Sequence, residues 1–80
     1  MMSTTWNEKV IELARMYLQN ATDLCDKKGT TLDSKRYFWE STYERLTGLH
    51  EGYITLNGSD ATWKMLAAYA RMALNKFLSI

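Results

Sequence analysis

Few side chains in this sequence could carry covalent chemistry. Among 80 residues there is one cysteine, Cys25, and one histidine, His50. A nucleophile and its general base must lie within hydrogen-bond reach, with a third group to orient the base. Cys25 falls on the apolar side of an expected helix, where a free cysteine commonly serves as a small buried hydrophobe. We therefore predict no catalytic residues and expect that the protein is not an enzyme.

Metal and cofactor sites are not indicated either. A transition-metal site normally combines several His, Cys or carboxylate ligands, and the sequence has no Cys-x-x-Cys pair. Phosphate-binding and dinucleotide-binding loops have characteristic glycine spacings after a strand. The four glycines do not show these spacings; they are Gly29, Gly48, Gly52 and Gly58. We predict no metal and no cofactor.

Basic side chains offer one route to nucleic acid. Lys35 and Arg36 precede three consecutive aromatic residues, and bases stack on such rings in single-strand binding proteins. The segment after residue 60 adds three cations and no acid, namely Lys64, Arg71 and Lys76. However, consecutive helical residues point around the whole circumference, and a net charge of +1 does not attract a polyanion to the protein as a whole. Nucleic acid is therefore the alternative partner and a protein is the preferred one.

Length and composition limit the architecture that can position these residues. A chain of 80 residues forms one domain, 1–80, and buries only about 60% of the surface its unfolded form exposes. One cysteine excludes an intrachain disulfide, so regular helix packing or oligomerisation must supply the missing stability. The first residues lack the pattern of a secretory signal, and no stretch approaches 20 apolar residues. We expect a cytoplasmic protein that does not interact with membranes.

Caps and apolar spacing predict three helices, at about 5–28, 31–56 and 60–79. Thr5-x-x-Glu8 has the form of a capping box for the first, and Gly29 suits its C-terminal end. Thr30, Thr31 and Asp33 are candidate N-caps for the second. The apolar face of the first helix contains two neighbouring stripes, of which one is Val10, Leu13, Tyr17 and Leu24 and the other is Ile11, Ala14, Leu18, Ala21 and Cys25.

The second helix contains two internal glycines. Trp39, Leu46 and Tyr53 continue a helical spacing past Gly48 and Gly52, which predicts a continuous helix. Each glycine costs about 1 kcal/mol relative to alanine, so a break between residues 48 and 52 is the alternative. The two glycines lie four residues apart, and a close approach to the small residues of the third helix, Ala67, Ala70 and Ala73, is a further hypothesis.

The third helix follows Asn57-Gly58, which fits a helix end, and Ser59 or Asp60 is the expected N-cap. Its apolar residues exceed what one buried face requires. The core stripe contains Trp63, Leu66, Ala70, Ala73 or Leu74, and Phe77, while Met65, Tyr69 and Met72 form a second stripe at i, i+4 and i+7.

The second stripe has two interpretations. It packs on the first helix, or it contacts another protein. Methionine adapts to partner surfaces and tyrosine combines a large area with a polar tip, so both suit an interface. Any exposed tryptophan among Trp6, Trp39 and Trp63 would enlarge that surface. The predicted partner-binding residues are Met65, Tyr69, Met72 and Trp63.

These observations predict an all-α protein, either a three-helix bundle or a helical hairpin with an accessory helix. The function they favour is binding to a larger protein and inhibiting or modulating it, as small helical inhibitors, immunity proteins and phage anti-defence proteins do. This expectation is an analogy from size and from the missing chemistry. Self-association as a homodimer is a second use of the same surface. The alternatives are a nucleic-acid-associated regulator and a small-molecule or nucleotide binder formed at an oligomer interface.

Overall fold

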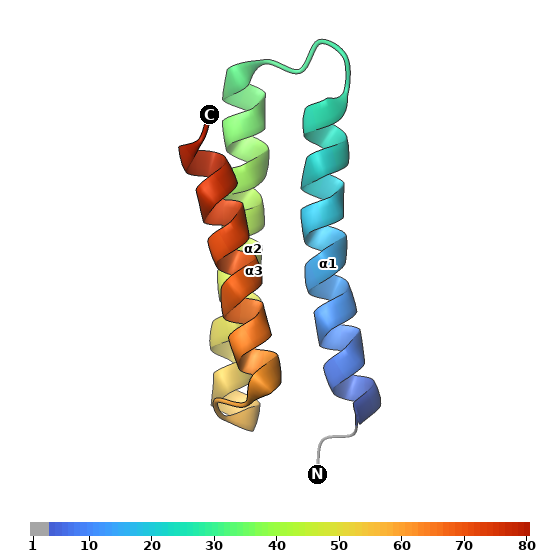
Figure 1. Ribbon diagram of the computed structural model, residues 1–80, viewed down its shortest axis with the longest axis vertical. Helices are drawn as coiled ribbons and strands as arrows, with labels where there is room; N and C mark the ends of the chain where they lie inside the picture. Colours follow the sequence, from blue (N-terminus) through green and yellow to red (C-terminus); the bar gives the residue numbers. More distant parts are fainter. Residues whose placement is uncertain (1–3) are drawn as a thin grey trace.

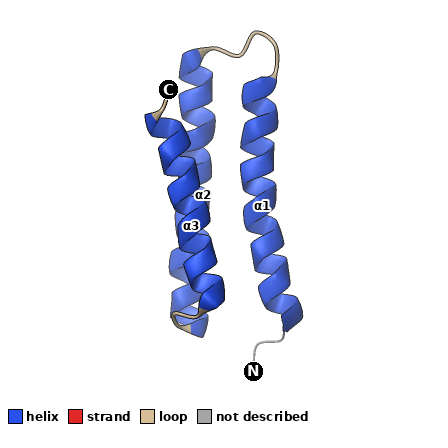
Figure 2. Ribbon diagram, in the orientation of Figure 1, coloured by secondary structure: helices blue, strands red, loops and turns tan. Residues whose placement is uncertain are grey.

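The computed structural model describes residues 4–80, with side chains from residue 7 onward, and shows three helices in sequence. They are α1 (Thr4–Asp26), α2 (Leu32–Asn57) and α3 (Ala61–Leu78). In Figures 1 and 2, α2 runs antiparallel to both neighbours, so that α1 and α3 point in the same direction. No strand occurs in residues 4–80. The predicted all-α three-helix bundle is therefore confirmed.

The bounds of α1 are close to the prediction. The helix already includes Thr4 and Thr5, and the capping box involves the Thr5 side chain, which is outside the described residues. At the other end α1 stops at Asp26, before Gly29, whose φ of 88° is in the left-handed region that favours glycine. The Thr30 hydroxyl donates to the carbonyl of Lys27 at 2.7 Å and so supplies a donor to the end of α1.

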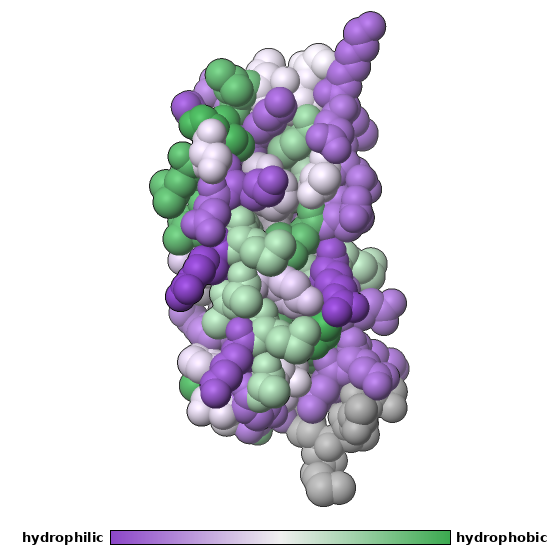
Figure 3. All heavy atoms as spheres, in the orientation of Figure 1, coloured by the Kyte–Doolittle hydropathy of each residue, from purple (hydrophilic) through white to green (hydrophobic). Residues whose placement is uncertain are grey.

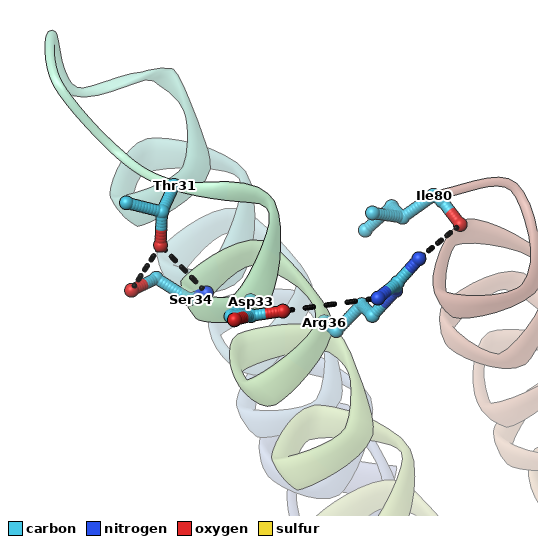
Figure 4. A network of polar contacts seen from close by, with 5 residues as sticks. All are labelled: Thr31, Asp33, Ser34, Arg36 and Ile80. Carbon is cyan, nitrogen blue, oxygen red and sulfur yellow. Dashed lines mark hydrogen bonds and ion pairs between the residues drawn. The ribbon is translucent and has the colours of Figure 1, made fainter.

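Figure 4 shows how α2 begins. Of the three predicted cap candidates, Thr31 is the N-cap, and its hydroxyl oxygen accepts the backbone N–H of Ser34 at 3.1 Å. Arg36 lies 3.8 Å from the carboxylate of Asp33 one turn away, and donates to the backbone carbonyl of Ile80 at 3.4 Å. The first turn of α2 therefore contacts the end of the chain after α3.

Helix α2 continues without a break through both internal glycines, as predicted. The hypothesis that these glycines permit close contact with α3 is wrong. A Cβ added at Gly48 or Gly52 would meet nothing within 4 Å, and both residues are exposed. Both glycines line a hollow that α2 forms with Val10 of α1. This hollow has no lining residue from α3, and Ala70, part of the small-residue face of α3, is buried in the core.

The turn between α2 and α3 joins all three helices. Gly58 has a φ of 79° and donates its N–H to the Ile54 carbonyl at 3.0 Å. Asp60 is the N-cap of α3 and accepts the backbone N–H of Trp63 at 3.0 Å. The buried Tyr53 hydroxyl donates to the Asp60 carboxylate at 2.8 Å and lies 3.1 Å from Oδ1 of Asn7 in α1.

The charge of Asp60 is expected to make folding pH-dependent. The backbone N–H of Trp63, followed by the Tyr53 hydroxyl, lowers the pKa of Asp60 from its usual value of 3.8. A lowered folded-state pKa stabilises the fold above the unfolded-state pKa, and this stabilisation is lost as the pH falls through the folded-state value. Asp60→Asn keeps a capping side chain but removes the charge. We expect a lower urea midpoint than wild type at pH 7.

The difference in midpoint should shrink when the same titration is made at an acidic pH low enough to protonate the wild-type carboxyl. Burial and the contact with Asp60 raise the pKa of Tyr53 above its usual value of 10.0. Tyr53 is therefore neutral at both pH values and does not contribute to the difference in midpoint. An equal difference between the two proteins at both pH values would show that the Asp60 charge does not stabilise the bundle.

The core lies along the length of the bundle. Leu46 of α2 and Leu66 of α3 are completely buried large side chains, and α3 packs more extensively on α2 than α1 does on either helix. The buried apolar residues are Ile11, Ala14, Ala21, Trp39, Leu46, Tyr53, Leu66, Ala70 and Ala73. Within residues 4–80, no helix combines the length and apolar character needed to cross a membrane.

Candidate interaction surface

The second apolar stripe of α3, here called the methionine stripe, consists of Met65, Tyr69 and Met72. The structure leaves Met65 40% exposed and Met72 51% exposed, while Tyr69 is half-buried. Arg15 of α1 donates through Nε to the Tyr69 hydroxyl at 3.1 Å. The stripe therefore lies along the border between α3 and α1, with its tyrosine packed and its two methionines accessible.

Figure 3 shows the face of the molecule on which α3 lies in front of α2, with α1 beside it. A band of apolar surface runs along the middle of this face, between hydrophilic side chains on both sides. Scattered apolar side chains are normal on protein surfaces, whereas contiguous apolar area with a polar rim is typical of interaction sites. The methionine stripe is therefore the candidate functional site.

A groove adjoins the methionine stripe at the α1 side. Its volume is about 630 Å³, and its lining comes mainly from the first turns of α1. Ile11 is buried there, whereas Glu8, Glu12 and Arg15 are exposed. The complete lining is Asn7, Glu8, Ile11, Glu12, Arg15 and Thr62. We call this the acidic groove, because its exposed residues include two carboxylates and one cation.

Trp63 does not belong to the methionine stripe, although it was predicted with it. Its ring stacks on His50 of α2, with centroids 4.4 Å apart and an interplanar angle of 24°. Trp39 is buried at 6% exposure, and the Trp6 side chain is outside the described residues. The described tryptophans are therefore packed between helices and do not enlarge the exposed apolar band.

The structure does not gather the predicted nucleic-acid contacts into one patch. Lys35 and Arg36 lie in the first turns of α2, and Arg36 already contacts Asp33 and Ile80. Lys76 is near the same end of the bundle, in the last turn of α3. Lys64 lies twelve residues earlier, which is about 18 Å along a helix. Arg71 shares the side of α3 with Lys64, at the i, i+7 spacing, and not with Lys76.

Cys25 and His50 are also separated. Cys25 packs near Trp39, and burial raises the pKa of its thiol above 9.0, so that it stays protonated at neutral pH. His50 stacks on Trp63, and it lies eleven residues after Trp39 in α2, about 16 Å along the helix. The pair does not have the contact that a nucleophile and base require.

Among the residues that the structure describes, no group of three or more His, Cys, Asp or Glu side chains could hold a metal ion. Comparisons of this chain with protein-family models, with curated proteins and with solved structures found no match.

The acidic groove was not foreseen from the sequence. Glu8, Glu12 and Arg15 lie opposite the apolar stripes of α1 in the helical pattern, and all three are exposed in the structure. A helical pattern identifies a polar face but not the neighbour beside it. The relevant signal is the charge contrast between the acidic polar face of α1 and the acid-free sequence of α3, but it becomes meaningful only when the two helices are known to be adjacent.

Proposed function

We propose that this chain is a non-enzymatic binding protein that contacts another protein through the methionine stripe of α3 and thereby inhibits or modulates it. The observation that supports the proposal is the exposure of two apolar side chains, Met65 and Met72, on the side of α3 beside a groove with charged edges. The two methionines are seven residues apart in α3, so their exposed apolar surface lies on one side of that helix.

The chemistry of the surface also suits a protein partner. Flexible thioethers adapt to the shape of a partner, and the tyrosine is held in place by Arg15, so little side-chain freedom is lost there on binding. A protonated thiol at Cys25 is compatible with a reducing, cytoplasmic location, which we include in the proposal.

The test replaces both exposed methionines and follows stability and contact separately. Met65→Gln/Met72→Gln should change the free energy of unfolding by less than about 1 kcal/mol, since surface substitutions have small effects. A photoreactive amino acid at Ala68, an exposed position between the two methionines, reports contact in cells. We expect a crosslinked protein species that is lost in the methionine variant.

The control variant is Leu56→Gln, which changes a side chain 76% exposed near the end of α2, away from the methionine stripe. This variant should keep the crosslink. Unfolding of Met65→Gln/Met72→Gln would identify the stripe as core, and a crosslink that persists in a folded methionine variant would place the contact elsewhere. Either result would contradict the proposal.

A further inference from the structure

Helices α1 and α3 carry charges of opposite sign, yet these charges do not meet within one chain. The helical segment from residue 61 to the end contains Lys64, Arg71 and Lys76 and no Asp or Glu. In α1 the acidic side chains Glu8, Glu12 and Asp23 are exposed. Among the described side chains, the only salt bridge is the one between Arg36 and Asp33, so no ion pair joins α1 to α3.

From this arrangement we propose that the methionine stripe binds a second copy of this chain, forming a two-fold dimer in which α3 of each copy packs on α1 of the other. The inference rests on the proposed function in that both assign protein contact to the methionine stripe, here with a second copy of the chain in place of a different protein. A second copy offers both parts of such an interface, because it carries the side of α3 with Met65, Met72 and Lys76 and the acidic groove of α1 that receives it.

The positions of the residues along the helix axes agree with this dimer. The hydrogen bond between Arg15 and Tyr69 places these residues at one level of the parallel helices α1 and α3. Met65 precedes Tyr69 by four residues, and Ile11 precedes Arg15 by four. A two-fold axis parallel to the helices keeps every level unchanged, so Met65 of one copy reaches the acidic groove of the other at the level of Ile11.

The same register pairs opposite charges near the other end of the stripe. Lys76 follows Tyr69 by seven residues and Asp23 follows Arg15 by eight, so both lie roughly 10–12 Å along the helices from the common level. Both side chains are exposed, and Lys76 is on the same side of α3 as Met65 and Met72, at i+11 and i+4 from them. Each dimer would contain this contact twice.

The alternative two-fold arrangement is less favourable. An axis across the helices would place α3 against α3, where Lys76 meets no acid, and α1 against α1, where the exposed acids Glu8, Glu12 and Asp23 of the two copies share one interface. Like charges facing each other across an interface are repulsive. The parallel axis instead sets Lys76 of each copy on the side of α1 that carries Asp23 in the other.

The size of the face is sufficient for a specific dimer. Figure 1 looks down the shortest axis of the molecule, so the face shown measures 47 × 20 Å between Cα atoms. Packed helix axes lie about 8–10 Å apart, so two helices of a second copy fit side by side across this face.

The experiment is a charge exchange followed by sedimentation equilibrium over a dilution series. Wild type should be a dimer at the upper concentrations. Lys76→Glu and Asp23→Lys should each raise the dimer dissociation constant about tenfold or more, because each creates two like-charge contacts per dimer. The double variant Lys76→Glu/Asp23→Lys should recover most of the wild-type affinity, because the exchanged charges attract each other again. Leu56→Gln should dissociate like wild type.

Recovery in the double variant is specific for self-association, since a different partner would not carry the exchanged charge. A double variant as weak as the single ones, with all variants folded by circular dichroism, would overturn the proposed register. A wild-type monomer at all concentrations would overturn the dimer. The proposed function would survive that result if the crosslink at Ala68 joins the chain to a different protein and is lost in Met65→Gln/Met72→Gln, so the two failures are distinguishable.

Discussion

Replacing Leu66 with alanine is expected to lower the free energy of unfolding by about 2–5 kcal/mol, the range observed when a fully buried leucine leaves a cavity. Leu66 has no exposed surface and lies in α3 where that helix packs on α2. A domain of this size has little stability in reserve, so the variant should be partly unfolded at moderate temperature. Urea titration followed by circular dichroism measures the change.

Met65→Ala is the matched control for Leu66→Ala, because the two positions are adjacent in one helix and both substitutions end in alanine. Met65 is 40% exposed, so its loss should cost less than about 1 kcal/mol. Equal losses at the two positions would mean that Met65 belongs to the core, and both the proposed function and the dimer would then lose their basis.

The double substitution Gly48→Ala/Gly52→Ala is expected to raise the free energy of unfolding by about 2 kcal/mol, because each glycine in a helix interior costs roughly 1 kcal/mol relative to alanine. Both glycines are inside α2, and the added Cβ atoms would meet nothing within 4 Å. Alanine also restricts the unfolded chain, which contributes in the same direction. Thermal and urea unfolding of the variant measure the gain.

Gly58→Ala gives the opposite expectation and serves as the control. The φ of 79° at Gly58 is strained for any residue with a Cβ, so this variant should be destabilised by about 1 kcal/mol or more even though the space around it is open. A loss of stability in Gly48→Ala/Gly52→Ala would show that α2 is not a regular helix at these positions in solution.

Much of the fold was predictable because helix signals are local. Caps act on the backbone within one turn, so Thr31 and Asp60 could be recognised as N-cap candidates without knowledge of the neighbouring helices. The spacing of Trp39, Leu46 and Tyr53 identified the buried side of α2 correctly. The largest error in a helix bound is two residues, at the end of α1, where residues before the glycine leave the helix early.

The site was predictable only in part. The methionine stripe follows from helical spacing, but its neighbour does not, and the sequence left open whether the first helix covers it. Trp63 illustrates the difference, since its position one turn from the stripe did not reveal that its ring stacks on His50. The acidic groove required knowledge of which helices are adjacent.

The sequence by itself determined where the helices lie and which side of each is apolar, because caps, glycines and helical periodicity act over a few residues. The tertiary structure decided which apolar residues remain exposed and which charges become neighbours. Residues 65 and 66 are adjacent, yet Leu66 is completely buried between helices and Met65 is at the edge beside the acidic groove. That difference depends on the angle at which α3 meets α1 and α2, which arises from packing across the whole bundle.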